Sequence, residues 1–291
     1  MGLRRIKMND MRSHSYLNLY KSCNPSHHSD DVIRIANVLV NKTNGIDNFI
    51  EMVGSLIRKA VDEVIDMPRT GRWSLDMIAN TEKTYLGTKV EILLTHAFQF
   101  SRGEKLDLCI DGTEVDVKNT VLSGWMIPKE AINEICWVVK INDKSAKFSS
   151  GLVFCSPDVL SKATNQDKKH TLRATSPAIL WLCKNATMPK NFFESIEDKS
   201  ILKQITDPKA NGTERVKRLF MLCTNQIIPR WAIESVAQQK DPMKRVRQNG
   251  GARNALSNMG IRVLNGAYDK EELIALGFSQ IKKDEWVSLR K

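Results

Sequence analysis

The sequence predicts an α/β protein in which a mixed β-sheet flanked by helices is followed by a mainly helical second part. Three apolar runs rich in β-branched and aromatic residues indicate buried strands: Glu134–Ile141, Gly151–Cys155 and Ala178–Cys183. Amphipathic runs that precede them indicate helices able to cover such a sheet. After the last strand the pattern changes to short helices separated by glycine turns. We therefore expect two domains, residues 1–185 and 186–291.

Two helices are expected near the N-terminus. Asp30 or Asp31 can accept hydrogen bonds from the first N–H groups of a helix over Val32–Val40. A second amphipathic run covers Ile46–Ile65. Both helices have an apolar face that can pack on the sheet.

A third helix is expected over Thr84–Phe100, and it carries one carboxylate in an unusual place. Glu91 lies off the apolar stripe of this helix, in a row otherwise made of glycine and apolar residues. A carboxylate in such a row lies either at a margin that faces water or in a lined cleft. The apolar stripe itself consists of Leu86, Val90, Leu93, Ala97 and Phe100.

The segment Leu106–Lys118 (LDLCIDGTEVDVK) is expected to form a β-hairpin with Asp111-Gly112 as its two-residue loop. A type I′ turn needs a positive φ at both loop residues, and Asp-Gly tolerates this conformation. The resulting register puts one apolar face toward a core. On that face Leu106, Leu108 and Ile110 oppose Val117, Val115 and Thr113.

The other face of the hairpin is charged and pairs like with like. Asp107 is expected to oppose Asp116 and Lys105 to oppose Lys118, while Cys109 opposes Glu114. Like charges directly across a strand pair destabilise it. A divalent cation such as Mg²⁺ would relieve the repulsion between the two aspartates. The alternative is an amphipathic ribbon whose charges face water.

A polar, basic loop, Ser161–Arg173, is expected between two of the strands. A solvated connection is the favoured interpretation. In a domain that cleaves DNA, its residues Lys168, Lys169 and Arg173 would contact phosphates.

The C-terminal part has the pattern of a winged helix-turn-helix, with helices, tight glycine turns and short strands in succession. Gly260 is expected to end the last of its helices. The expected elements are helices over Glu214–Cys223 (capped by Thr213), Pro229–Gln239, from Met243 onward (after Asp241-Pro242) and Ala252–Met259, and strands at Ile261–Leu264 and Trp286–Leu289.

Positive charge is concentrated in this C-terminal part. Between Lys240 and Arg262 there are six basic residues against the single acid Asp241. Arginine, asparagine and glutamine are the residue types that bind phosphates and base edges. A solvated helix face is the alternative. The candidate DNA-binding residues are Lys244, Arg245, Arg247, Gln248, Asn249, Arg253 and Asn254.

The candidate site resembles that of a known family. Glu91, Asp107, Asp116 and Lys118 follow the pattern of an acidic helix residue and a D…(D/E)-x-K signature, as in restriction-type nucleases. Their spacing, with the flanking stretches TEKTYLGTKVEIL and SGWMIP, resembles the NaeI-type type II restriction endonucleases. These enzymes join a nuclease domain to a DNA-binding domain, so the resemblance covers most of the chain.

The resemblance implies a restriction-endonuclease-like fold and a role for each matching residue. Asp107 and Asp116 would bind Mg²⁺ with Glu91 as a further acid, and the backbone carbonyl of Val117 would be an extra ligand. Lys118 would be the catalytic base or a charge stabiliser. The resemblance further implies double-stranded DNA as substrate, a homodimer, and a second copy of the DNA site as effector. A cognate DNA methyltransferase that acts on the same site would fit this function.

Composition agrees with a polyanionic partner. The chain has 291 residues and a formal net charge of +11. No apolar run approaches the roughly 20 residues of a spanning helix, and no apolar stretch follows MGLRRIK as in a signal peptide. The six cysteines are spread singly, which favours reduced thiols in the cytoplasm. Cys23, His27 and His28 are of zinc-binding types, but without a second half nearby a polar loop is favoured.

The hypothesis is a Mg²⁺-dependent type II restriction endonuclease that hydrolyses both strands of duplex DNA at a specific short palindromic site. One alternative is a nuclease of DNA repair that is directed by mismatches or DNA structure and shares the metal site. The other is a winged-helix transcription regulator in which the hairpin is only structural and needs no metal.

Overall fold

The structure is a computed structural model that describes residues 29–247 and 251–290. The chain divides into two compact units. The first contains the described residues up to Ala60 together with Lys83–Pro189. The second contains Val61–Glu82 together with the described residues from Lys190 onward, so it is built from two separate stretches of chain.

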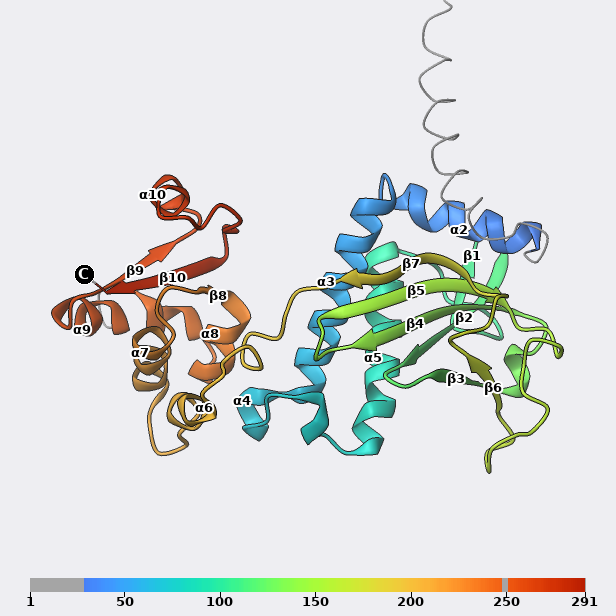
Figure 1. Ribbon diagram of the computed structural model, residues 1–291, viewed down its shortest axis with the longest axis horizontal. Coiled ribbons are helices and arrows are strands. Elements are labelled where there is room, and N and C mark those ends of the chain that lie inside the picture. The colour runs from blue at the N-terminus through green and yellow to red at the C-terminus, as the bar shows by residue number, and fades with distance from the viewer. Residues whose placement is uncertain (1–28, 248–250, 291) are drawn as a thin grey trace, which may run out of the picture. The chain divides into compact units, whose positions relative to one another are not determined.

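The first unit is built on a mixed sheet, as predicted, with five strands in the order β1-β2-β4-β5-β7 (Figure 1). Strands β2 and β4 are parallel, and the other neighbouring strands are antiparallel. Each of the three apolar runs forms a strand, and the strand expected at 151–155 starts earlier because its pairing with β4 continues back to Lys147. The strands are β1 (Leu108–Ile110), β2 (Thr113–Thr120), β4 (Ile135–Asn142), β5 (Lys147–Phe154) and β7 (Leu180–Thr187).

Three helices flank this sheet, as predicted: α2 (Asp30–Lys42), α3 (Ile46–Ile65) and α5 (Asn80–Phe98). Figure 1 shows α3 and α5 behind the strands, and α2 packs across β5 and β7. The predicted cap of α2 is wrong by one residue. Ser29 is the N-cap, and its hydroxyl accepts from the N–H of Val32, so the two aspartates fall in the first turn.

Aromatic packing joins these helices to the sheet. Trp137 of β4 stacks on Phe49 of α3 at 6.3 Å between ring centroids and meets Phe98 of α5 edge to face at 5.3 Å. All three side chains are fully buried. This face of the sheet is therefore closed by a dry aromatic core.

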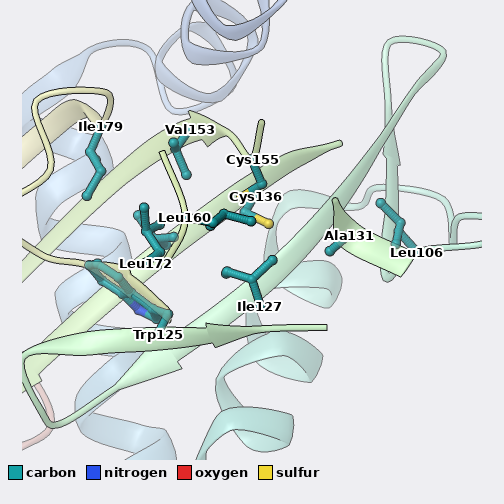
Figure 2. Close-up of a cluster of buried hydrophobic side chains, with 11 residues drawn as sticks. Leu106, Trp125, Ile127, Ala131, Cys136, Val153, Cys155, Leu160, Leu172 and Ile179 are labelled. Carbon is teal, nitrogen blue, oxygen red and sulfur yellow. The ribbon is translucent and has the colours of Figure 1, made fainter. Parts of the chain in front are cut away.

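The opposite face is covered by a small antiparallel sheet of β3 (Gly124–Ile127) and β6 (His170–Arg173), which sequence reasoning missed. Its Trp125 and Leu172 are buried in a cluster with side chains of β4 and β5 (Figure 2). The prediction of a loop over Ser161–Arg173 is wrong for its last four residues. They form a strand, because they pair with β3 and bury Leu172. The 3₁₀ helix η3 (Lys129–Ala131) follows β3.

The second unit combines short helices with a three-stranded antiparallel sheet in the order β8-β10-β9. Helix α7 packs against α8 and α9. The elements are α4 (Met67–Thr70), η2 (Leu75–Met77), α6 (Lys199–Ile205), α7 (Gly212–Leu222), β8 (Ile227–Pro229), α8 (Arg230–Ala237), η4 (Pro242–Val246), α9 (Ala252–Asn258), β9 (Ile261–Asn265), α10 (Lys270–Ala275) and β10 (Glu285–Arg290).

Several details of this unit differ from expectation. Asn211, not Thr213, caps α7, because its side chain accepts from the N–H of Glu214. The segment after Asp241 forms a short 3₁₀ helix, η4, rather than an α-helix. Helices α6 and α10 and strand β8 were not predicted. Gly260 follows α9 with a φ of 73°, as a helix stop requires.

Two further expectations concerned membrane-spanning segments and a cluster of zinc-binding residue types. No helix within residues 29–247 and 251–290 is long and apolar enough to cross a membrane. Cys23, His27 and His28 lie outside the described residues.

Candidate active site at the β1–β2 hairpin

The predicted hairpin forms with its predicted loop. Asp111 and Gly112 have φ values of 51° and 75°, the left-handed conformation that a type I′ turn needs at both positions. The register then follows as expected, with Leu108 opposite Val115 and Ile110 opposite Thr113. The side chains of Leu108, Ile110 and Val115 are fully buried, so the apolar face is confirmed.

Leu106 departs from this face. The strand pairing stops at Leu108, and residues 104–107 form a bend instead of continuing β1. As a result Leu106 joins the cluster that contains Ala131 and Cys136 (Figure 2). The prediction that Leu106 lies with Leu108 is therefore wrong, because the alternation of faces holds only within a strand.

Glu114 holds this bend in place. Its carboxylate accepts hydrogen bonds from the backbone N–H groups of Glu104 at 2.8 Å, Lys105 at 3.2 Å and Leu106 at 2.7 Å. These N–H donors hold the pKa of Glu114 below its usual range. Lys105 turns to Glu134, 2.9 Å away, rather than facing Lys118 as the extended register predicted.

Asp107 comes directly after this bend and reaches across to β2. Its Oδ2 accepts a hydrogen bond of 2.8 Å from the backbone N–H of Val117. A carboxylate tied to the backbone in this way has a fixed position. The bend therefore places Asp107 next to Asp116, which is the juxtaposition that the sequence predicted, without regular strand pairing at this point.

Asp116 is the most deeply buried acid of the site, with 5% of its side chain exposed. Its Oδ1 lies 2.7 Å from the Nζ of Lys118. Burial, and next the neighbouring Asp107, raise the pKa of Asp116 to about 7, although Lys118 opposes the shift. Around neutral pH the group is thus poised between its protonated and ionised forms.

Lys118 lies between two acceptors of its own strand. Besides Asp116, its Nζ is 3.4 Å from the carbonyl oxygen of Val117. Burial works to lower the pKa of Lys118, but Asp116 and Asp107 more than offset it, and the net shift is upward. Its side chain is 24% exposed, so the ammonium can reach a bound substrate.

Glu91 joins the site from α5. It is partly buried, and burial followed by the charge of Asp107 raises its pKa, while Lys118 and Arg102 lower it. Glu91 is thus within electrostatic reach of Asp107 and Lys118, and the structure gathers the four predicted residues. Arg102 was not singled out from the sequence, because the bend that brings it here has no sequence pattern of its own.

The donor set fits a magnesium ion. Among the described residues, no group of three or more His, Cys, Asp or Glu side chains stands close enough to hold a metal alone. Mg²⁺ is typically held by one or two carboxylates, with waters and substrate phosphate as its other ligands. Asp107 and Asp116 supply such a pair. Burial disfavours the ionised form of Asp116, and a nearby cation would favour it.

The predicted DNA-binding residues that the structure describes are in the second unit. Lys244 and Arg245 lie in η4, where Lys244 also pairs with Asp241 at 3.2 Å. Arg247 follows η4 and is exposed. The partly buried Arg253 and the exposed Asn254 lie in α9, while Gln248 and Asn249 fall outside the described residues.

Arg262 belongs to the same basic stretch but is engaged elsewhere. Its guanidinium forms a two-pronged ion pair with Glu272 of α10, at 2.7 and 2.9 Å. In the first unit, Lys168 of the polar loop and Arg173 at the end of β6 are exposed.

Comparison with known proteins finds a family model and a relative that span both units. The family model of restriction endonuclease NaeI matches residues 38–291, a span that includes both the hairpin and the basic stretch. The type II restriction enzyme NaeI of Lentzea aerocolonigenes is 34% identical over 271 residues, which cover 90% of this chain and 83% of the relative.

Proposed function

Because this chain belongs to the NaeI family of restriction endonucleases, we propose that it cuts DNA at the site formed by Asp107, Asp116 and Lys118. Membership makes the protein a site-specific deoxyribonuclease of type II and sets aside the non-enzymatic regulator. One observation carries the assignment to this site. The buried carboxylate of Asp116 lies 2.7 Å from the ammonium of Lys118 on the strand that the signature marks, and the half-buried Asp107 lies beside it.

The proposed cofactor is Mg²⁺, held by Asp107 and Asp116, with the Val117 carbonyl and Glu91 as further ligands. When bound, the ion would activate a water and neutralise charge on the scissile phosphate. The chain's own contribution is to hold the ligands still. The N–H of Val117 fixes Asp107, and Lys118 orients Asp116.

Lys118 is proposed to stabilise negative charge on the phosphate. Its ammonium already donates to Asp116 and lies near the Val117 carbonyl, so one of its three N–H groups can turn to a phosphate oxygen. Fixed donors at the position where charge develops contribute more than flexible ones, because they need no reorganisation during the reaction.

The second unit is proposed to be a winged-helix DNA-binding domain. Exposed Arg247 and Asn254 flank the start of α9, next to the partly buried Arg253. Residues of these types bind phosphates and base edges. Replacing Arg247 by Gln should weaken DNA binding and reduce the slope of log affinity against log salt by about one if it contacts a phosphate. Arg262→Gln serves as the matched control, since Arg262 is paired with Glu272.

The assembly is proposed to be a homodimer that cuts a palindromic site and is stimulated by a second DNA copy. Both strands of a palindrome present the same sequence, so a two-fold dimer can place one site on each strand. Sedimentation in the presence of DNA tests the dimer, and addition of an uncleavable duplex with the same site tests the stimulation. We further propose cytoplasmic action beside a methyltransferase that protects the host's own sites.

The first experiment is a digest of unmodified phage DNA with purified protein, in Mg²⁺ and in EDTA, beside Asp116→Asn. Discrete fragments that need Mg²⁺ and vanish in the variant support the proposal. Fragments that persist with Asp116→Asn would place the chemistry elsewhere. Nicking confined to mismatched duplexes would instead support the repair nuclease.

A further inference from the structure

Asp116 is held from both of its oxygens. The Nζ of Lys118 donates to Oδ1, and the Sγ of Cys136 lies 3.9 Å from Oδ2. A thiol is a weak donor, and this separation suits the large radius of sulfur. The signature of the family places Lys118 near Asp116, but the partner of the second oxygen comes from a different strand.

The position of Cys136 follows from the sheet. Strands β2 and β4 are parallel neighbours, and Asp116 stands directly beside Cys136 in their register. The two side chains therefore emerge on the same face of the sheet. Cys136 has no exposed surface and lies in the apolar cluster with Ile127 and Ala131 (Figure 2).

This cluster forms a dry wall behind the carboxylate. On this buried side the Cys136 thiol is the donor near Oδ2, and it also lies within hydrogen-bonding reach of Cys155. A carboxylate held at both oxygens loses the freedom to rotate about its terminal torsion, which is otherwise broad. An apolar residue of similar size at this position would close the wall but offer no donor.

We propose that Cys136 is a positioning residue of the cleavage site, and that its thiol sets the orientation of the Asp116 carboxylate toward the metal and substrate. The inference rests on the proposed function, because it takes Asp116 as a ligand of the cleavage site. Cys136 acts through Asp116 and does not itself touch the DNA. Partners that orient a metal ligand in this way are typically worth about 10- to 100-fold in metal affinity or activity.

The chain offers a control in Cys183, because Cys155 interacts directly with the Cys136 thiol. Cys183 is also buried and lies on β7, which β4 and β5 separate from β2. Cys136→Ala and Cys183→Ala each remove one buried sulfur atom from the same sheet. Cys136→Ser restores a donor, and Cys136→Val fills the volume without one, which keeps the test usable if the alanine variant does not fold.

The measurements are kcat and KM for a plasmid substrate, the Mg²⁺ concentration at half-maximal rate, and the rise in Tm that Mg²⁺ causes in the absence of DNA. We expect Cys136→Ala to lower kcat by about tenfold or more, with KM for DNA nearly unchanged and a higher Mg²⁺ requirement. The Mg²⁺-induced rise in Tm should shrink as well, because weaker binding stabilises the folded protein less. Cys136→Ser should recover most of the lost rate.

The outcomes distinguish a failure of the proposed role of Cys136 from a failure of the proposed cleavage site. If Cys136→Ala and Cys183→Ala lower Tm and kcat equally, the role of Cys136 is packing alone and the inference is overturned. The same holds if Cys136→Val keeps the kcat and Mg²⁺ response of the wild type. If Asp116→Asn cleaves normally in the same assay, the proposed site fails first, whatever the cysteine variants show.

Discussion

Two buried ion pairs in the first unit have nearly the same local geometry but different surroundings. Arg58 of α3 meets Asp143, just after β4, at 2.5 Å, with 4% and 5% of the side chains exposed. Lys118 meets Asp116 at 2.7 Å, with 24% and 5% exposed. Both aspartates are thus equally buried, and only the second pair opens to solvent on its cationic side.

The difference lies in the charges around each pair. At Asp143 a guanidinium is sealed against the carboxylate, which is the arrangement of a structural ion pair. At Asp116, burial and next the neighbouring Asp107 raise the pKa to about 7, and Glu91 lies within electrostatic reach of Asp107 and Lys118. An excess of carboxylate in a partly open site is unfavourable by itself. Such an excess of negative charge is typical of a functional site where a bound cation would compensate it and allow a polyanionic substrate to approach.

The largest expected effect separates the two aspartates by activity. Asp116→Asn should reduce the cleavage rate by about 10⁴-fold, as loss of a central catalytic group typically does. DNA affinity, measured by fluorescence anisotropy without metal, should remain. Asp143→Asn, corrected for its folded fraction, should cleave at the wild-type rate. Equal losses in the two variants would contradict the comparison.

The second effect separates them by stability. Asp143→Asn should lower the free energy of unfolding by about 3 kcal/mol, because it leaves the buried Arg58 guanidinium without its carboxylate. Denaturant unfolding monitored by circular dichroism measures this loss. Asp116→Asn should be destabilised far less, since it removes a charge from a site where like charges repel. A more stable Asp143→Asn protein would show that the pair is not structural.

The third effect concerns pH. The pKa of Asp116 is raised, chiefly by burial, so the folded protein retains this proton up to about pH 7 whereas the unfolded chain releases it near its ordinary value. The stability of the metal-free protein should therefore fall as pH rises from about 4 to about 7. Mg²⁺ binds the ionised form and competes with the proton. Below about pH 7 the half-saturating Mg²⁺ concentration should rise up to about tenfold per pH unit lowered.

That pH dependence is tested by Mg²⁺ titrations of the cleavage rate at several pH values. The Glu91→Gln variant checks whether Asp116 alone accounts for this pH dependence. If it does, the variant should show the same change of Mg²⁺ requirement with pH as the wild type. A Mg²⁺ requirement that is independent of pH would contradict the raised pKa of Asp116.

The smallest effect tests the turn that sets the register of the site. Gly112 has a φ of 75° and open space around its Cα, so Gly112→Ala meets conformational strain rather than a clash. The expected loss is about 1 kcal/mol of stability, seen as a lower Tm. The cleavage rate of the folded variant should stay unchanged. A large loss of activity would mean that the loop also contacts substrate.

The sequence predicted the hairpin loop, the register of the strand residues next to it, the three buried strands and the helices α2, α3 and α5. These features depend on local rules, since turn residues and the periodicity of apolar residues report on neighbours close in the chain. It missed β3 and β6, whose pairing joins residues about forty-five positions apart and has little local signal. The bend at 104–107 was missed because Glu114 stabilises it from the opposite strand.

For the active site, the sequence by itself singled out the residues that we propose carry the chemistry: Glu91, Asp107, Asp116 and Lys118, as a spaced set of acids and one lysine. It also predicted that the two aspartates meet, although the bend at 104–107, rather than continued strand pairing, places Asp107 beside Asp116. Only the tertiary structure decided how each carboxylate is held and how strongly it is perturbed. Burial raises the pKa of Asp116, and the parallel neighbour strand β4 places the Cys136 thiol behind this carboxylate. Both effects depend on packing between segments that are distant in sequence.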